Sequence, residues 1–175
     1  MASIEERHAP ARGAEFRTAA ERIRAEIANP VVERPDRQFR GSARRRFPGF
    51  SLLQMARLRF LQEGNPRLSG TIDAIARELA HEGWLLRYNL NDGFGKPSVA
   101  FVICSFWLID ALACAGRRAR SLFDCIHGAL SPLGLLSEDY DTATSRTWGN
   151  FPQTYSHVGL IHAAFAVSPQ WADVL

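Results

Sequence analysis

Apolar side chains recur at three- and four-residue intervals along most of this 175-residue chain. That spacing lines one face of an α-helix. It predicts a first helix over 14–28, where Phe16 and Ile23 belong to the apolar stripe, and a second over 50–61. Between them, 29–49 contains several prolines and many arginines and is predicted to be irregular.

A third helix is predicted over 72–81, after a start signal at Ser69 or Thr71. Gly83 follows the last periodic residue and is suited to stop the helix in a left-handed conformation. The segment 84–89 is rich in aromatic and aliphatic residues and is interpreted as a short strand or an extended turn.

The second half of the chain alternates apolar and amphipathic segments. A continuous apolar run predicts a helix over 98–115, a narrower stripe predicts another over 117–130, and a last helix is predicted over 153–167. Together these patterns predict an all-α fold of about six helices with little strand. Inner helices covered by outer ones produce such an alternation, as in a toroid of helical hairpins.

Charge does not favour a nucleic-acid partner. The net charge is +3, which is too small to indicate one by itself. Lys96 is the only lysine, so 20 of the 21 basic residues are arginine, a bias that suggests a GC-rich coding sequence. Seven of these arginines lie within 37–59, without a recognisable binding motif. We interpret that segment as a solvated run and expect no nucleic-acid binding.

Neither metal binding nor a membrane location is expected. The three cysteines (Cys104, Cys114 and Cys125) form no CxxC pair and suggest buried, reduced thiols in a cytoplasmic protein. We expect no metal site and no cofactor. The N-terminus lacks the apolar core of a signal peptide. The run 99–115 contains a serine and an aspartate and falls short of ~20 apolar residues, so we interpret it as a buried helix.

Three acidic residues lie within four positions of a predicted loop: Glu138, Asp139 and Asp141. A loop carboxylate can act as a general base on a water held against a substrate. The other interpretation is a solvated acidic loop or a helix cap. Aromatic residues around the loop, Trp148 among them, suit the faces of sugars and cationic transition states.

Polar residues elsewhere could complete a sugar site. Asn150, Gln153 and His157 could hydrogen-bond sugar hydroxyls, or they could cap the last helix and fill the core. Ser105 and Trp107 interrupt the apolar helix, and their polar groups need partners when buried. We expect them to face either the core or a polar cavity.

Three stretches resemble glycoside hydrolase family 15, which contains glucoamylases, glucodextranases and bacterial trehalases. Residues 104–112 (CSFWLIDAL) resemble a helix of the family, 134–141 (GLLSEDYD) its catalytic-base loop, and 149–157 (GNFPQTYSH) the turn that follows. The match is strongest over 98–167 and weakens toward Ser51 and the first helix.

The resemblance implies an (α/α)6 barrel and inverting hydrolysis of α-glucosidic bonds. In that mechanism one carboxylic acid protonates the glycosidic oxygen and a second carboxylate, roughly 6.5–9.5 Å away, activates a water. Glu138 matches the family's general base, and Asp139 and Asp141 match supporting carboxylates.

The family's general acid lies upstream in a Trp-Glu-Arg-type motif that this chain does not contain. Twelve helices with their connections would also need about twice this length. We therefore interpret 1–175 as the C-terminal portion of a family 15 catalytic domain, inactive by itself, with 1–13 disordered. A local frameshift is a further hypothesis for the arginine-rich residues 37–50.

Two other interpretations stay open. The chain could be one half of a split glycosidase whose second chain completes the barrel, or a non-enzymatic helical module that binds sugar or protein. The expected ligand is an α-glucoside or a trehalose-type sugar, and the motifs do not distinguish a glucan from trehalose.

Overall fold

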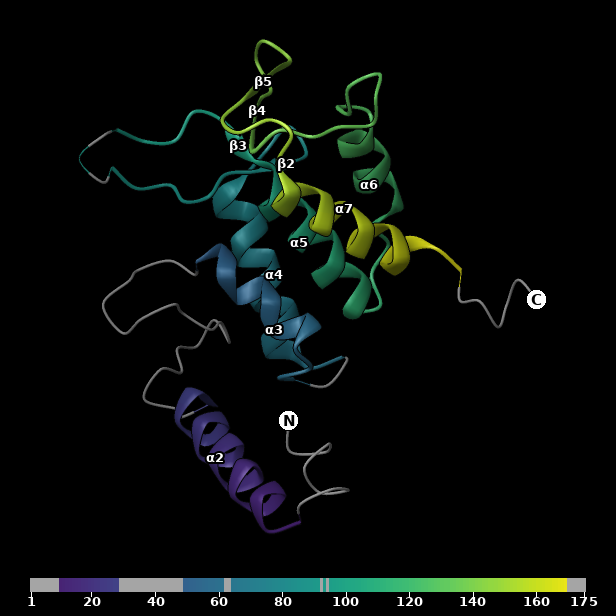
Figure 1. The fold of residues 1–175 in the computed structure, drawn as a ribbon. Coiled ribbons are helices and arrows are strands. Elements are labelled where there is room, and N and C mark those ends of the chain that lie inside the picture. Colours follow the sequence, from purple (N-terminus) through teal and green to yellow (C-terminus); the bar gives the residue numbers. More distant parts are fainter. Residues whose placement is uncertain (1–9, 29–48, 62–63, 92, 94, 170–175) are drawn as a thin grey trace. The chain divides into compact units, whose positions relative to one another are not determined.

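A computed structural model of the chain describes residues 10–28, 49–61, 64–91, 93 and 95–169 (Figure 1). The chain divides into two compact units, 1–35 and 36–175, and each is described by itself. Apart from Gly49, the irregular segment predicted over 29–49 lies outside the described residues, as does most of the hypothesised frameshift.

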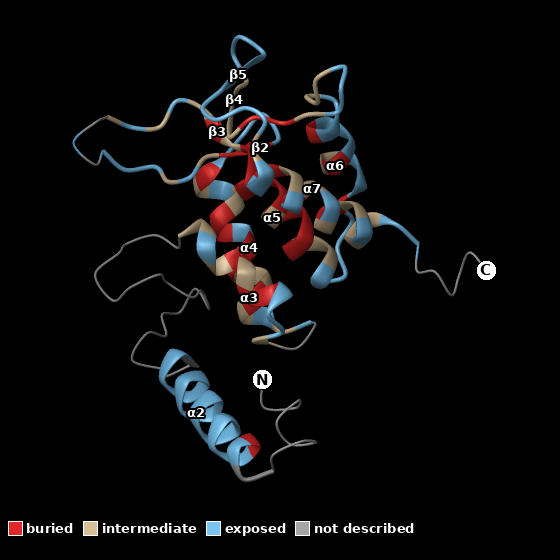
Figure 2. Cartoon of the chain, viewed as in Figure 1, coloured by how far each residue is buried: buried red, intermediate tan, exposed pale blue. Residues whose placement is uncertain are grey.

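The first unit contributes one helix, α2 (Pro10–Ala28). The helix begins four residues before the predicted start, so the segment 1–13 is not irregular throughout; residues 1–9 lie outside the described part. Its apolar stripe is exposed at Phe16, Ile23 and Ile27. Figure 2 shows α2 in the colour of exposed residues along nearly its whole length.

The second unit opens with a 3-10 helix, η2 (Phe50–Leu53), that continues into α3 (Gln54–Arg57). The predicted helix over 50–61 is therefore shorter than expected. Arg59 takes a positive φ of 51°, which an α-helix cannot accommodate, and the chain turns there.

Helix α4 (Pro66–Leu79) begins earlier than predicted because Asn65 caps it. The Asn65 Oδ1 accepts a hydrogen bond from the Arg67 N–H at 2.9 Å, and Pro66 occupies the first helical position, where its missing N–H costs nothing. The predicted start at Ser69 or Thr71 was wrong, since a cap and a proline together outweigh a lone hydroxyl.

The predicted end of this helix was also wrong. After α4 the chain forms a hairpin of β1 (Ala80–His81) and β2 (Trp84–Leu85). Glu82 and Gly83 connect the strands with φ values of 50° and 84°. A two-residue hairpin turn with both central residues at positive φ matches the twist of its strands. Gly83 therefore serves a hairpin turn and does not stop the helix.

Three further helices complete the unit: α5 (Val102–Cys114), α6 (Arg120–His127) and α7 (Thr154–Val167). They confirm the mostly helical fold, with six α-helices in the described part of the chain. Strand content is small. β3 (Ala100–Phe101), β4 (Asp139–Asp141) and β5 (Arg146–Trp148) form an antiparallel sheet in the order β3-β4-β5.

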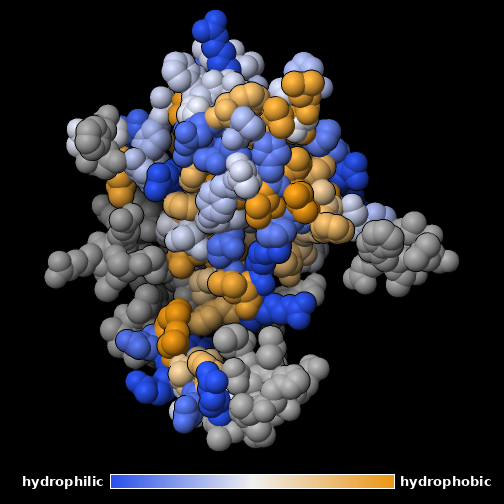
Figure 3. Space-filling model, viewed as in Figure 1, coloured by the Kyte–Doolittle hydropathy of each residue, from blue (hydrophilic) through white to orange (hydrophobic). Residues whose placement is uncertain are grey.

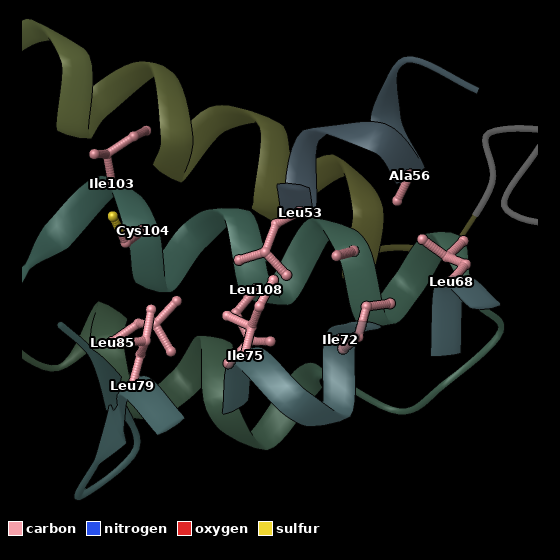
Figure 4. Close-up of a cluster of buried hydrophobic side chains, with 11 residues drawn as sticks. Leu53, Ala56, Leu68, Ile72, Ile75, Leu79, Leu85, Ile103, Cys104 and Leu108 are labelled. Carbon is pink, nitrogen blue, oxygen red and sulfur yellow. The ribbon is translucent and has the colours of Figure 1, made fainter. Parts of the chain in front are cut away.

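Helix α5 lies at the centre of the second unit and packs against α3, α4, α6 and α7. Its side chains enter both hydrophobic clusters of the core. In the cluster drawn in Figure 4, Leu53 of η2, Ile75 of α4 and Leu108 of α5 point toward one another. Burial of each such side chain contributes about 1.5–3 kcal/mol to folding. The apolar run is thus a core helix.

The polar residues of α5 have partners inside the protein. Asp110 is 4% exposed and forms an ion pair with Arg57 of α3, with 3.0 Å between Nη1 and Oδ2.

Among the cysteines only Cys104 is buried, and burial raises the pKa of its thiol. Cys114 and Cys125 are exposed, contrary to the prediction of buried thiols. No helix in the described residues is long and apolar enough to cross a bilayer.

Candidate functional site

The acidic loop is attached to the end of the core helix. The Val102 N–H, at the start of α5, donates to the Glu138 carbonyl at 3.0 Å. The Glu138 N–H in turn donates to the Asn150 carbonyl at 3.0 Å. Strand β4 pairs with β3 on one side and with β5 on the other. The backbone of Glu138 is therefore held from both sides by the small sheet.

The residues before Glu138 are attached to α7. The Gln153 N–H donates to the Leu136 carbonyl at 2.8 Å, and the Leu136 N–H donates to His157 Nε2 at 3.3 Å. Since Nε2 accepts, Nδ1 carries the proton and donates to the Gln153 carbonyl at 2.7 Å. The buried Ser156 hydroxyl adds a bond to the Ser137 carbonyl at 2.8 Å. Gln153, Ser156 and His157 thus fasten the loop to α7.

The Glu138 carboxylate is oriented through one of its two oxygens. Oε2 accepts from the Asn150 side-chain amide at 2.7 Å and from the Asn150 backbone N–H at 3.2 Å. Oε1 has no hydrogen-bond partner among the described residues. The side chain is half-buried. A carboxylate fixed by one oxygen and open at the other is arranged to accept a proton at the open one.

Gly149 makes this arrangement possible. It has a φ of 76°, a conformation that side chains disfavour. A Cβ at this position would lie 2.9 Å from Glu138 Cβ, 3.0 Å from Glu138 Oε2 and 3.2 Å from Asp139 Oδ2. The two carboxylates therefore flank the glycine, and a larger residue would displace at least one of them.

The two neighbouring aspartates differ in electrostatic environment. Burial, followed by the nearby charge of Glu138, raises the pKa of Asp139 to about 6, while Arg87 opposes the shift. The Thr144 hydroxyl, which donates to Asp141 at 2.6 Å, lowers the pKa of Asp141. Asp141 also accepts from the Ala143 N–H and so shapes the turn between β4 and β5. Asp139 therefore belongs to the carboxylate cluster, and Asp141 to the turn.

Two sets of aromatic rings are in contact in this unit, and one exposed indole lies in the small sheet. Tyr140 stacks on the buried Trp84 with 4.3 Å between ring centroids, which anchors β4 to the core. Trp107 lies between Phe50 and Tyr155, at 5.5 and 5.8 Å. Trp148 lies opposite Asp139 in the sheet and is 55% exposed. An exposed indole beside carboxylates is suited to cover the face of a sugar ring.

Several of the residues selected from the sequence lie together. Asn150 binds Glu138, whereas Gln153 and His157 bind the backbone of Leu136. Ser105 lies inside the core and accepts a hydrogen bond from the Leu85 N–H at 2.9 Å, so this hydroxyl connects α5 with β2.

Sequence reasoning missed two contributors to the site, Gly149 and Arg87. Gly149 lies in the turn that was assigned to the site, but the sequence pattern cannot show which atoms an added Cβ would meet there. Arg87 lies over the ring of Phe101, the residue opposite Asp139 in the sheet, and no local sequence pattern shows this placement.

The chain is similar to curated trehalases. It is 36% identical over 162 residues to the trehalase of Mycolicibacterium smegmatis and 36% identical to that of Mycobacterium tuberculosis, in both cases over 87% of this chain. A trehalase of Thermoplasma acidophilum is 37% identical over 65% of the chain. No protein-family model matches. The chain spans about a quarter of the length of the two mycobacterial relatives, 24% and 23%.

Solved glycosidases share the fold. One wild-type glycosidase superposes with a TM-score of 0.73 at 22% identity, over 92% of this chain and 46% of that chain. A variant of a glycosidase in complex with glucose superposes equally well. At this identity the likeness concerns the fold. The chain is therefore related to part of the trehalases and has the helical fold of part of a glycosidase.

Proposed function

We propose that this chain forms the part of a trehalose-hydrolysing glycosidase that carries the general base, Glu138. The chain resembles glycoside hydrolase family 15 at the loop that contains Glu138. The relatives reported above are trehalases. This favours trehalose over a glucan, and the earlier alternative of a glucoamylase-like substrate becomes the second choice.

The observation that carries the proposal is the asymmetry of the Glu138 carboxylate. Asn150 occupies Oε2 with two hydrogen bonds, whereas Oε1 has no partner within the described residues. A general base must be fixed in direction and still have an oxygen free for the proton of the attacking water. A carboxylate that only shaped a loop would be expected to use both oxygens, as Asp141 does with Ala143 and Thr144.

In the proposed reaction a water bound at Glu138 Oε1 attacks the anomeric carbon of one glucose unit. Glu138 takes the water's proton as the new C–O bond forms. A carboxylic acid from a part of the enzyme that this chain does not span protonates the glycosidic oxygen as the old bond breaks. Attack opposite the leaving group inverts the anomeric centre.

The remaining candidate residues divide into two roles. Trp107, Trp148, Asn150 and Gln153 are proposed to contact the sugar, with the exposed Trp148 covering one face of the ring. His157 and Ser105 hold backbone groups of the loop and of β2, so they act on the site by positioning it.

A hybrid enzyme tests this proposal. In the M. smegmatis trehalase, the stretch that matches this chain is replaced by the corresponding residues of the chain. We expect the hybrid to release glucose from trehalose. Glu138→Gln in the hybrid should lower kcat by about 10²–10⁴, the contribution of a general base, while trehalose binding is kept.

Asp141→Asn is the matched control, because it removes a carboxylate from the same loop at the turn. It should leave kcat within a few-fold of the hybrid. A Glu138→Gln hybrid with normal turnover would show that the base has been assigned to the wrong residue. A folded hybrid that binds trehalose without hydrolysing it would favour a sugar-binding module instead.

A further inference from the structure

His157, near the start of α7, binds the backbone two residues before Glu138. Its Nε2 accepts a hydrogen bond from the Leu136 N–H at 3.3 Å, and its Nδ1 donates to the Gln153 carbonyl at 2.7 Å. An imidazole that accepts at one nitrogen and donates at the other is neutral. These two hydrogen bonds therefore define both the charge and the tautomer of His157.

Leu136 depends on this acceptor because it is buried. The residue is 2% exposed, and its carbonyl is already bound to the Gln153 N–H at 2.8 Å. A buried N–H that loses its partner incurs the full desolvation penalty of that group. The carbonyl of the next residue, Ser137, accepts from Ser156 at 2.8 Å. The backbone that leads into Glu138 is thus bound to α7 at consecutive residues.

Protonation of His157 at Nε2 would break one of these contacts. The imidazolium donates from both nitrogens and accepts at neither, so its new N–H would point at the Leu136 N–H. The bond to the Gln153 carbonyl would persist, since Nδ1 keeps its proton. Histidine ordinarily changes charge between about pH 5 and 8. Mild acid should therefore detach the acidic loop from α7 at Leu136.

The surroundings of α7 offer little compensation to an imidazolium. The helix contains no aspartate or glutamate, and Figure 3 shows hydrophobic side chains gathered over it. The partial positive charge at the start of a helix also disfavours a cation there. His157 forms no ion pair with any residue of the described part of the chain.

The neighbouring elements carry other titratable groups. They are Cys104 and Asp110 on α5, Asp124 and His127 on α6, and Glu138 and Asp139 on the loop. Helix α7 itself adds Tyr155 and His162. Asp110 and Asp124 are ion-paired with arginines of α3 and α6. The two loop carboxylates are the groups whose own protonation could also change the loop, so the test includes a variant of each.

We propose that His157 is a pH-sensitive positioning residue: its neutral form holds the acidic loop against α7, and its protonation releases the loop at Leu136. The release itself does not require hydrolysis. Its effect on the reaction rests on the proposed function, because a loosened loop no longer holds Glu138 in the direction that a general base needs.

Amide hydrogen exchange in the full 175-residue chain tests the release. NMR measures the protection factor of the Leu136 N–H from about pH 8 to about pH 5, and the imidazole nitrogen shifts report the charge and tautomer of His157. We expect the Nδ1–H tautomer at the higher pH and at least an about tenfold fall in Leu136 protection as the ring is protonated. The Leu86 N–H, bound to the Leu79 carbonyl at 2.9 Å beside the β1–β2 hairpin, is the reference and should stay protected.

His157→Gln separates the charge from the hydrogen bonds. A glutamine amide can donate to one group and accept from another, but it does not ionise. This variant should keep Leu136 protected and remove the pH dependence. His162→Gln is the matched control, because it removes the other histidine of α7 and should behave as the parent chain does. Glu138→Gln and Asp139→Asn should likewise leave the pH dependence in place.

A Leu136 N–H that stays protected while the His157 ring is protonated overturns the proposal, and this measurement needs no variant. A pH dependence that survives in His157→Gln, or that disappears in Glu138→Gln or Asp139→Asn, overturns it as well.

The hybrid trehalase tests the effect on the reaction. The ratio of kcat at about pH 5 to kcat at about pH 7 should be at least about threefold higher for His157→Gln than for the parent hybrid. An unchanged ratio in a hybrid that hydrolyses trehalose overturns the positioning role. If the hybrid does not hydrolyse trehalose but exchange at Leu136 depends on pH as expected, the proposed function fails while the release at His157 is supported.

Discussion

At the scale of single residues, Gly149 is constrained twice: by its positive φ and by the carboxylates that flank it. Gly149→Ala should cost about 1–2 kcal/mol for the left-handed conformation and a further 1–3 kcal/mol for overpacking against Glu138. Gly134→Ala separates the two costs, since Gly134 has a φ of 73° and no atom within 4 Å of the added Cβ. Thermal melting of both variants should show the larger loss for Gly149→Ala; equal losses would mean that Glu138 moves freely aside.

Asp139 should make the stability of the chain depend on pH. Its folded pKa of about 6 lies above the usual 3.8, so the folded state holds a proton that the unfolded state loses. The free energy of unfolding should therefore fall as pH rises from about 4 to about 6 and then level off. Asp139→Asn should remove this loss. Solvent screens this half-exposed carboxyl, so we expect the melting temperature at pH 7 to rise by only roughly 2–4 °C.

Asp141→Asn is the control of opposite sign. The lowered pKa of Asp141 means that its carboxylate stabilises the folded state at neutral pH, and this contribution is lost on acidification. That variant should melt lower at pH 7 and converge with the parent chain at acid pH. If Asp139→Asn also lowers the melting temperature at pH 7, the carboxylate of Asp139 is a net stabilising contact and the burial argument fails.

The sequence could identify Glu138 as a candidate because a run of carboxylates in a loop next to aromatics is visible locally. It could not show that Asn150 would bind one oxygen of that carboxylate twice, or that Gly149 would separate two carboxylates. Those relations depend on β4 and β5 pairing in one register, Asp139 opposite Trp148. A shift of one residue would send each side chain to the other face.

At the scale of elements, the crossing of α5 and α7 depends on Gly159. A Cβ there would lie 2.5 Å from Ile103 Cδ1 and 3.0 Å from Phe106 Cβ. Gly159→Ala should therefore destabilise the chain by about 1–3 kcal/mol, even though alanine is the better helix former by about 1 kcal/mol. Ile103→Val removes the Cδ1 atom and by itself costs about 0.5–1.5 kcal/mol.

In the double variant part of the clash is relieved, so its loss should be smaller than the sum of the two single losses. Urea denaturation of the four proteins measures this coupling, which we expect to be at least 0.5 kcal/mol. Additive losses would place the strain elsewhere, with Phe106 as the next residue to examine.

Long helices were predictable because their apolar spacing extends over many residues, as over 153–167. The ends of the elements were not. The Asn65 cap and the Glu82–Gly83 turn each depend on one or two residues, and strands of two or three residues are too short for an alternating pattern to be recognised. Those short strands nevertheless hold Glu138, so the least predictable elements position the candidate site.

At the scale of the whole molecule, the length argument anticipated that half of a toroid is present. The solved glycosidases agree, since the chain covers less than half of theirs. Helix α7 has no aspartate, glutamate, lysine or arginine, yet Ile161 and Phe165 are exposed. Hydrophobic periodicity cannot show which side of such a helix will be exposed. The C-terminal placement of this chain within a glycosidase fold stays a prediction.

A chain limited to these 175 residues should not hydrolyse trehalose at an enzymatic rate. The proposed general acid lies outside it, and such an acid contributes about 10²–10⁴ to the rate. Glucose release by the isolated chain should therefore be at least about 10²-fold below that of the hybrid, and Glu138→Gln should not lower it further. If the isolated chain instead matches the hybrid, both carboxyl groups lie within these residues. Asp139 would not be that acid, because its Oδ2 and the Oε2 of Glu138 both lie within 3.2 Å of the position of a Gly149 Cβ and are closer together than the roughly 6.5–9.5 Å of an inverting pair. Asp139→Asn should therefore leave that activity in place, and abolition of the activity by Asp139→Asn would contradict the inverting mechanism.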